Sequence, residues 1–419
     1  MSLDIALSGI QAINEQLGTI SNNIANAGTY GFKASRANFS AQYAGDQAAG
    51  TRIGSTTQSI DLNGGVVSTG RALDASINGR GFFVSKDMQG QTNYSRAGIF
   101  NADSNGFLSD SSGRRVQGFS MKPPSTLLGP MGDLTIPTGQ VPAVATTKLT
   151  YVTNLSADWS VPIQTAWTEP VAADPAQGIT EVLADPTAYN MSRVSVAYDT
   201  LGTQHTITQY FVKSATPNVV TVHYAVDGVG NGQTTDLTFN SDGSLLSTGA
   251  PVTPEEPATF ALTINPVNGA TDPLTLKVDY KGTTQFAGEA TTSSNQADGY
   301  ASGTFTGVEL APDGSLVAKY TNGQKQAVGK LAIATFPDEG ALIPVNETSW
   351  QASTASGTPL YTTPGVGMAG ALSTGSLEQS NVDITAELVG LMTAQRNYQA
   401  NSKVLQTEST ILQSLMQAM

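Results

Sequence analysis

Apolar residues recur at every seventh position at both ends of the chain, with further apolar residues four places after some of them. The N-terminal row is Leu3, Leu7, Ile10, Leu17 and Ile24, and the C-terminal row is Ile384, Leu388, Leu391, Tyr398, Leu405, Leu412 and Met416. Seven-residue spacing keeps one face of a helix against a partner and favours a left-handed supercoil. The sequence therefore predicts a helix at each end, and each row forms a narrow seam that a lone helix leaves uncovered.

The predicted helices have clear boundaries. Gly28 ends the first row, and Ser380 with Asp383 forms a capping pair before the second. The second helix is about 34 residues and about 50 Å long. Periodicity alone is compatible with two interpretations: a helical hairpin on a globular core, or a module through which copies of the chain assemble.

Motifs at both ends resemble the signatures of the bacterial flagellar rod and hook proteins. The matching positions are Asn22, Asn23, Asn26, Gly31, Phe32 and Lys33 near the first helix, and Asn381, Asp383, Gln395, Arg396, Tyr398 and Gln399 near the second. Segments 79–84 and 94–100 resemble the first globular segment of that family. The resemblance covers residues 1–145 and 286–419, whereas 146–285 match no motif.

The expected fold is mixed and mainly β, with nested discontinuous β domains and terminal helices that pair in a coiled-coil-like core. Residues 1–33 and 376–419 are expected to form the helical domain, 34–65 an extended connector, 66–145 and 286–375 the first β-rich domain, and 146–285 an inserted sandwich-like or barrel-like domain. Period-two runs at 194–198, 207–212, 219–224 and 274–278 predict strands in the insert.

The resemblance implies a structural subunit of the flagellar hook, a curved tube that transmits torque from rod to filament. It implies self-assembly into a helical homopolymer. The further partners it implies are the distal rod protein, the hook cap protein, the hook–filament junction protein and the flagellar export apparatus. It also implies a place in the flagellum outside the cell, reached without a cleaved signal peptide.

Composition excludes several other functions. The net charge of −13 disfavours nucleic acid and anionic membranes as partners. The chain has no cysteine, which excludes disulfides, thiolate zinc sites and thiol nucleophiles. No apolar run approaches the roughly 20 residues of a membrane-spanning helix, so no membrane insertion is expected.

No motif predicts catalysis, a cofactor or a metal. The only histidines, His205 and His223, lack neighbours at metal-ligand spacing and are expected to be structural. The Asp103–Gly106 stretch could begin a calcium loop, but the twelfth position is Arg114 rather than an acid. A turn is the expected structure there, and the chain is not expected to be an enzyme.

Two alternatives remain open at this point. A distal rod or other rod subunit would share both ends of the chain, although such subunits generally lack a large middle insert. A secreted β-rich binding protein would use the insert as its working part, with Trp159 and Trp167 as the close aromatic pair.

Overall fold

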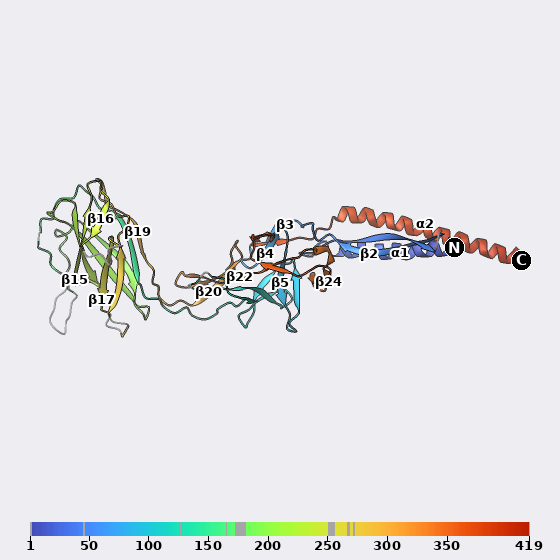
Figure 1. The fold of residues 1–419 in the computed structure, drawn as a ribbon, viewed down its shortest axis with the longest axis horizontal. Helices are drawn as coiled ribbons and strands as arrows, with labels where there is room; N and C mark the ends of the chain where they lie inside the picture. Colours follow the sequence, from blue (N-terminus) through green and yellow to red (C-terminus); the bar gives the residue numbers. More distant parts are fainter. Residues whose placement is uncertain are drawn as a thin grey trace. The chain divides into compact units, whose positions relative to one another are not determined.

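The computed structural model describes residues 2–44, 47–123, 125, 127–164, 166–171, 182–249, 256–265, 269–270 and 273–418. The described chain is mainly β-sheet, with one helix near each terminus (Figure 1), as the sequence predicts. It divides into two compact units. Unit 1 comprises Met1–Thr138, Thr306–Lys319 and Lys325–Met419, and unit 2 comprises Gly139–Phe305 and Tyr320–Gln324.

The two helices belong to unit 1 and lie side by side (Figure 1). Helix α1 spans Ser2–Ala25 and α2 spans Ile384–Ala418. The predicted cap of α2 is confirmed, since Asp383 Oδ1 accepts hydrogen bonds from the backbone N–H groups of Thr385 (2.9 Å) and Ala386 (3.2 Å). Neither helix in the described part of the chain is long and apolar enough to cross a membrane.

A long antiparallel hairpin stands where the sequence predicts an extended connector. Strands β1 (Ser35–Ala44) and β2 (Gln47–Gln58) pair along their length and pack against α1. The backbone N–H of Thr51 donates to Ser8 Oγ of α1 at 3.2 Å. The sequence does not show this pairing, because the strands are rich in small and polar residues, and the backbone ladder and the helix beneath stabilise them without an apolar alternation.

The remaining elements of unit 1 are short strands and one 3-10 helix, and an aromatic cluster packs against several of the strands. They are β3 (Val66–Ser68), β4 (Ala75–Asn78), β5 (Phe82–Lys86), β6 (Thr92–Ser95), β7 (Phe100–Ala102), β8 (Leu108–Asp110), β9 (Arg115–Ser120), β10 (Met131–Asp133), β20 (Phe305–Leu310), β21 (Ser315–Tyr320), β22 (Lys325–Leu331), β23 (Ile333–Thr335), η1 (Glu339–Ala341), β24 (Ile343–Val345), β25 (Ser349–Gln351), β26 (Leu360–Thr362), β27 (Ala371–Thr374) and β28 (Ser376–Glu378). Phe82 packs on Trp350 with ring centroids 5.5 Å apart, and Tyr94 meets Phe336 edge-on at 4.8 Å. These rings pack on strands β5, β6 and β25 of the large sheet, whereas β28, which precedes α2, pairs with β3 in a separate two-stranded sheet.

Several hairpins use the same turn, an aspartate followed three residues later by glycine. Asp103 Oδ1 accepts hydrogen bonds from the backbone N–H groups of Asn105 (2.9 Å) and Phe107 (2.7 Å), and Gly106 has a φ of 76°. A left-handed φ of this kind favours glycine. The carboxylate is therefore engaged by the backbone of its own turn, which confirms the predicted turn at this position.

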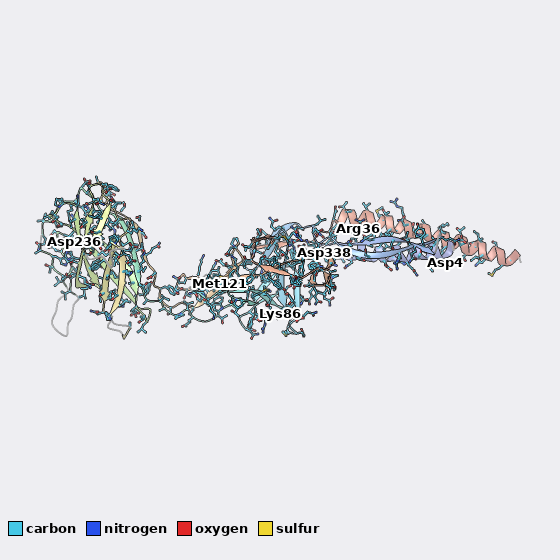
Figure 2. All side chains as sticks on the ribbon, viewed as in Figure 1. Asp4, Arg36, Lys86, Met121, Asp236 and Asp338 are labelled. Atoms are coloured by element: carbon cyan, nitrogen blue, oxygen red, sulfur yellow. The ribbon has the colours of Figure 1, made fainter. Side chains whose placement is uncertain are left out.

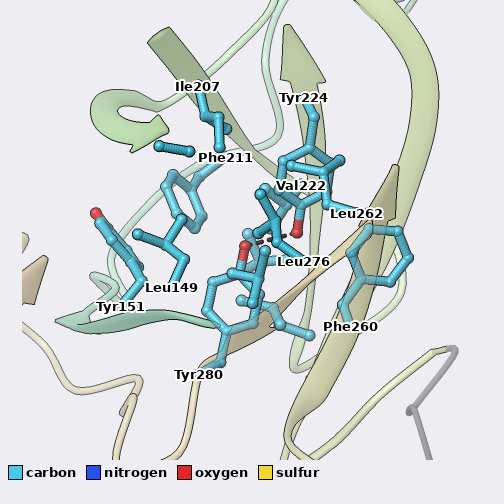
Figure 3. Close-up of a cluster of buried hydrophobic side chains, with 14 of the residues drawn as sticks. Leu149, Tyr151, Ile207, Phe211, Val222, Tyr224, Phe260, Leu262, Leu276 and Tyr280 are labelled. Carbon is cyan, nitrogen blue, oxygen red and sulfur yellow. Dashed lines mark hydrogen bonds between the residues drawn. The ribbon is translucent and has the colours of Figure 1, made fainter. Parts of the chain in front are cut away.

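Unit 2 consists of two sheets that share one apolar core. One sheet contains β17 (Thr259–Ile264), β18 (Leu274–Asp279), β11 (Lys148–Asn154) and β19 (Thr291–Ala297) in that order. The other contains β12 (Met191–Tyr198), β13 (Gln204–Lys213), β14 (Val219–Val226), β15 (Val229–Phe239) and β16 (Leu245–Thr248). All four strands predicted by period two are confirmed. Figure 3 shows the core side chains, among which the Tyr224 and Tyr280 hydroxyls are hydrogen-bonded at 2.6 Å.

Candidate assembly site at the two chain ends

The two helices contact each other through a small apolar cluster. Ile13, Ile20 and Ala394 are buried at its centre, and Leu17, Ile24 and Leu391 pack around them half-buried. Residues of the predicted seam therefore lie at the rim of this contact. Ile13 and Ile20, which lie at its centre, are also seven residues apart but were not part of the predicted row. Farther along, Gly9 lies so close to Asn401 that an added Cβ would be 3.0 Å from Nδ2.

Most of the remaining seam is uncovered. Ile10 and Leu405 are half-buried, and the side chain of Leu3 lies outside the described residues. The exposed members are Leu7 (44% exposed), Ile384 (50%), Leu388 (47%), Tyr398 (37%), Leu412 (51%) and Met416 (74%), joined by the unpredicted Val389, Met392, Val404 and Ile411. We call these ten residues, one on α1 and nine on several sides of α2, the exposed apolar face. The C-terminal turns of α2 extend beyond α1 (Figures 1 and 2), so α1 does not cover the apolar residues there.

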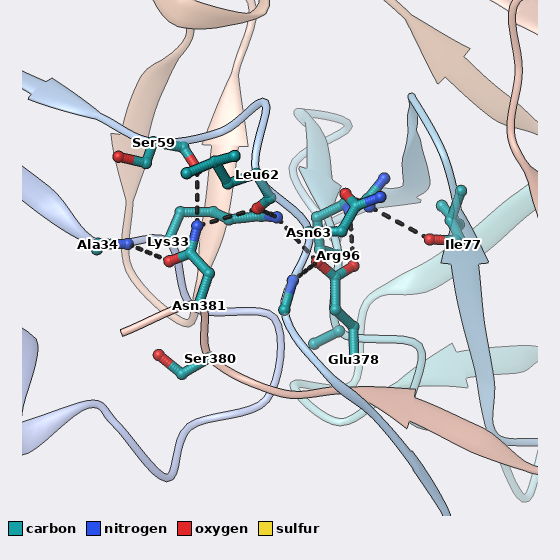
Figure 4. Close-up of polar contacts among 12 residues, drawn as sticks. Lys33, Ala34, Ser59, Leu62, Asn63, Ile77, Arg96, Glu378, Ser380 and Asn381 are labelled. Carbon is teal, nitrogen blue, oxygen red and sulfur yellow. Dashed lines mark hydrogen bonds and ion pairs between the residues drawn. The ribbon is translucent and has the colours of Figure 1, made fainter. Parts of the chain in front are cut away.

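A buried ion cluster lies where the two chain ends enter the β part of unit 1 (Figure 4). Glu378 Oε1 accepts hydrogen bonds from Lys33 Nζ (2.8 Å) and from the backbone N–H of Gly64 (3.0 Å). Its Oε2 accepts from Arg96 Nε at 2.8 Å. The three side chains are between 0% and 3% exposed. One carboxylate therefore holds together a residue after α1, the strand before α2 and the β-sheet region.

The two cations of this cluster are further satisfied by backbone oxygens. Lys33 Nζ also donates to the carbonyl of Leu62 at 2.6 Å, and Arg96 Nη1 donates to the carbonyls of Gly79 (2.9 Å) and Gly81 (2.6 Å). Burial lowers the pKa of Lys33, although the Glu378 carboxylate acts in the opposite direction. The cluster carries two cations and one anion, so its stability depends strongly on Glu378.

Two asparagines of the family motif tie the neighbouring segments to the helices. Asn23 donates to the carbonyl of Ser35 and to Glu387 Oε1, both at 2.8 Å, and accepts from the Ser35 N–H at 2.9 Å. Asn381 accepts from the backbone N–H of Ala34 at 2.7 Å and donates to the carbonyl of Ser59 at 2.8 Å. They thus join α1, the β1–β2 hairpin and α2.

Gly31 is required by the same junction. Its φ is 71°, and its N–H donates to the Glu378 carbonyl at 2.8 Å. A Cβ at this position would be 2.7 Å from the backbone nitrogen of Ala97. Asn26 Nδ2 donates to Asn22 Oδ1 at 2.8 Å and closes the end of α1. Phe32 is half-buried beside these residues.

The part of the C-terminal motif that lies within α2, from Gln395 to Gln399, does not join this junction. Gln395, Arg396 and Gln399 are exposed on α2, as Tyr398 is. Gln395, Tyr398 and Gln399 line a shallow hollow with Asn14 and Leu17 of α1. These side chains are available to a neighbour, whereas the motif residues at 23, 31, 33 and 381 act within the chain.

The histidines and tryptophans of unit 2, which were candidates for metal or ligand binding, contact other side chains of the same unit. His205 Nδ1 lies 2.7 Å from Asp227 Oδ2, and His223 stacks on Trp167 with ring centroids 4.2 Å apart. Trp159 packs against the apolar core of the unit. Among the described residues, no group of three histidine or acidic side chains could hold a metal ion. This environment gives no support to the interpretation as a secreted β-rich binding protein that uses Trp159 and Trp167.

His223 leads to a prediction about pH. Burial lowers its pKa from the ordinary 6.5, with the Asp236 carboxylate opposing the shift. The unfolded chain therefore takes up a proton as pH falls below about 6.5 that the folded unit resists, and stability present above that pH is lost below it. We expect the free energy of unfolding to fall less between pH 7 and pH 5 in His223→Phe, which can keep the stack on Trp167, than in the parent chain. Urea titrations at a series of pH values would measure this free energy. An equal fall in both proteins would contradict the prediction.

Comparisons with known proteins match the whole length of the chain. Family models match residues 3–33 (Flagella basal body rod protein), 76–153 (Flagellar hook protein FlgE/F/G D1 domain), 134–300 (Flagellar basal body protein FlaE D2 domain) and 373–418 (Flagellar basal body rod FlgEFG protein C-terminal).

The chain is 32% identical to the Flagellar hook protein FlgE of Salmonella typhimurium and 32% identical to that of Escherichia coli, each over 99% of both chains. It is 30% identical to the Flagellar hook protein FlgE of Borreliella burgdorferi over 99% of this chain and 98% of that one. A crystal structure of Helicobacter pylori flagellar hook protein FlgE2 superposes with a TM-score of 0.49 at 12% identity, covering 73% of this chain and 98% of that one.

These relatives place the chain, whose two helices are tied through one buried junction, among the structural proteins of the flagellar rod and hook class. Within that class the chain belongs to the flagellar hook protein family. It is a structural subunit of the flagellum outside the cell, and its relatives are structural proteins rather than enzymes. Neither a rod subunit nor a secreted binding protein is favoured by these relatives.

Proposed function

We propose that this chain builds the hook by covering the exposed apolar face of each copy with the helices of neighbouring copies. The observation that carries this proposal is the exposure of the α2 side chains at both ends of the helix, including Leu388 at 47% and Leu412 at 51%. A soluble chain gains about 25 cal/mol for each Å² of apolar surface that it removes from water, so these side chains favour association. In the assembled hook, α1 and α2 would pair in a coiled-coil-like core.

Assembly into a tube rather than a closed dimer would use heterologous contacts between unlike surfaces of the helical region. The apolar cluster that joins α1 to α2 leaves a different surface exposed on each helix, so one copy offers unlike surfaces to its neighbours. Heterologous contacts that do not close generate an open helix. In such an open helix, the same contact between neighbouring copies would repeat along the hook and around its circumference.

The buried junction gives this tube its mechanical continuity. Glu378 links Lys33, which follows α1, to Arg96 in the β part of unit 1. A force on the helices would therefore reach the sheet through paired charges and backbone hydrogen bonds rather than through a flexible linker. This arrangement suits a hook that transmits torque from the rod to the filament.

The remaining partners follow from the family. We propose that the first copies contact the distal rod protein, that the last copies contact the hook–filament junction protein, and that a hook cap protein covers the growing end. Delivery would use the flagellar export apparatus. All four partners would meet the same helical ends, because these carry the surfaces that repeat along the tube.

Salting-out of the purified chain tests the proposal. Electron microscopy should show tubes, because high concentrations of an excluded salt such as sulfate strengthen apolar burial. Dispersed particles or amorphous aggregate under a range of conditions that leave the chain folded would contradict self-assembly.

Deletion within unit 2 tests which part of the chain sets the curvature. Val144 and Tyr300 form a bridge in which each backbone N–H donates to the other residue's carbonyl at 2.9 Å. Replacing residues 145–299 with an Asn-Gly pair should therefore close a short hairpin and leave unit 1 intact. Because the exposed apolar face is untouched, we expect thinner tubes that still form but are straighter than those of the full chain.

The matched control for this deletion is circular dichroism and thermal unfolding of the shortened chain. Curved tubes of ordinary shape would place the source of curvature in unit 1. Failure to form tubes by a folded shortened chain would show that unit 2 makes contacts that assembly requires.

A further inference from the structure

Four methionines in the described part of the chain are exposed, and two of them lie on α2. Met392 is 56% exposed and Met416 is 74% exposed. The other two, Met88 (96%) and Met368 (56%), lie in the β part of unit 1, outside the helices. The thioether sulfur is the most easily oxidised group of this chain, because the sequence contains no cysteine thiol that would react first.

Each of these two methionines of α2 lies next to a leucine of the exposed apolar face. Met392 follows Leu388 by four residues, and Met416 follows Leu412 by four. Residues four apart are neighbours on the surface of a helix. The first pair lies near the start of α2 and the second near its end, so each end of the exposed apolar face contains a thioether.

We propose that Met392 and Met416 are modification sites at which a peroxide switches off assembly. The inference rests on the function proposed above. The sulfur attacks one oxygen of hydrogen peroxide, the O–O bond breaks, and the oxygen is transferred to form methionine sulfoxide. Sulfur is thereby oxidised by two electrons, and the peroxide is reduced to water.

The modification acts through polarity. A sulfoxide oxygen is a strong hydrogen-bond acceptor, and burying it between apolar side chains of two copies would leave it without a donor. The free chain presents both sulfurs to solvent, whereas assembly would cover them. The switch therefore acts on subunits before they are added, and a methionine sulfoxide reductase would reverse it.

Polymerisation of the full chain after treatment with hydrogen peroxide tests the inference. Peptide mass spectrometry would quantify oxidation at each methionine, and sedimentation after salting-out would give the concentration needed for assembly. We expect oxidation at positions 392 and 416 to raise that concentration by about ten-fold or more. Treatment with the reductase should restore the original value.

Two matched variants separate the helix sites from the others. Met392→Leu/Met416→Leu should assemble normally and keep assembling after peroxide, while Met88→Leu/Met368→Leu should remain as sensitive as the parent chain. Equal sensitivity of the first variant, or normal assembly of a parent chain oxidised at both α2 positions, would overturn the inference. Failure of the untreated parent chain to assemble would instead contradict the proposed function, and with it the inference.

Discussion

Leu412→Asp should abolish tube formation while leaving the free chain as stable as the parent. Leu412 is 51% exposed near the end of α2, so the carboxylate remains hydrated in the free chain. In the tube the same carboxylate would be buried without a partner, which costs several kcal/mol at every copy. Because 1.4 kcal/mol is a factor of ten, the concentration needed for assembly should rise by about a thousand-fold or more.

The neighbouring position supplies the control. Gln413 is also exposed, but it lies about 100° further around the helix. Gln413→Asp adds the same charge and leaves the apolar row intact, so it should assemble at a concentration within a few-fold of the parent chain. Sedimentation and electron microscopy would measure both variants, and thermal unfolding would confirm equal monomer stability. Tubes from Leu412→Asp at ordinary concentrations would contradict the role of this residue.

Glu378→Gln should cause a large loss of stability in unit 1. The change keeps the shape of the side chain but removes the only negative charge of the buried cluster, leaving Lys33 and Arg96 as buried cations. Breaking a buried ion pair in this way typically costs about 3–5 kcal/mol. Denaturant unfolding of the full chain, followed by a probe in unit 1, would measure the loss.

An exposed ion pair provides the comparison. Glu309 and Lys319 are 32% and 41% exposed and lie within contact distance in the same unit. Glu309→Gln should cost less than about 1 kcal/mol, because solvent screens pairs of this kind. Adding Lys33→Met to Glu378→Gln should recover part of the lost stability, since it removes one of the stranded cations. Equal unfolding free energies for Glu378→Gln and Glu309→Gln would exclude the buried cluster as a main source of stability.

The helical ends could be predicted from the sequence because their signals are local. Seven-residue spacing, a capping aspartate and a terminating glycine each act within a few residues of the chain. It was harder to predict which row of apolar residues on α1 contacts α2. Ile13 and Ile20 form the buried contact, whereas the predicted Leu7 is 44% exposed, since several apolar rows around α1 satisfy the same spacing.

The buried junction could not be predicted, because its members are distant in sequence. Lys33, Arg96 and Glu378 meet only after the chain has folded, and nothing near Glu378 distinguishes it from other acids. The motif around Lys33 and the segment containing Arg96 did indicate important residues. The sequence did not reveal that these residues pair with Glu378. It also did not reveal the β1–β2 hairpin, because backbone hydrogen bonds rather than apolar side chains define that element.

We expect copies of the chain to cover the α2 part of the exposed apolar face when they assemble. Because the chain has no cysteine, Leu388→Cys introduces a single thiol at a position that is 47% exposed. Ser241→Cys, in an exposed turn of unit 2, serves as the reference. Maleimide labelling of free chains and of tubes would compare the two thiols. We expect labelling at position 388 to be at least about ten-fold slower in tubes than in free chains, with much less change at position 241. Equally fast labelling of position 388 in tubes and in free chains would contradict the claim.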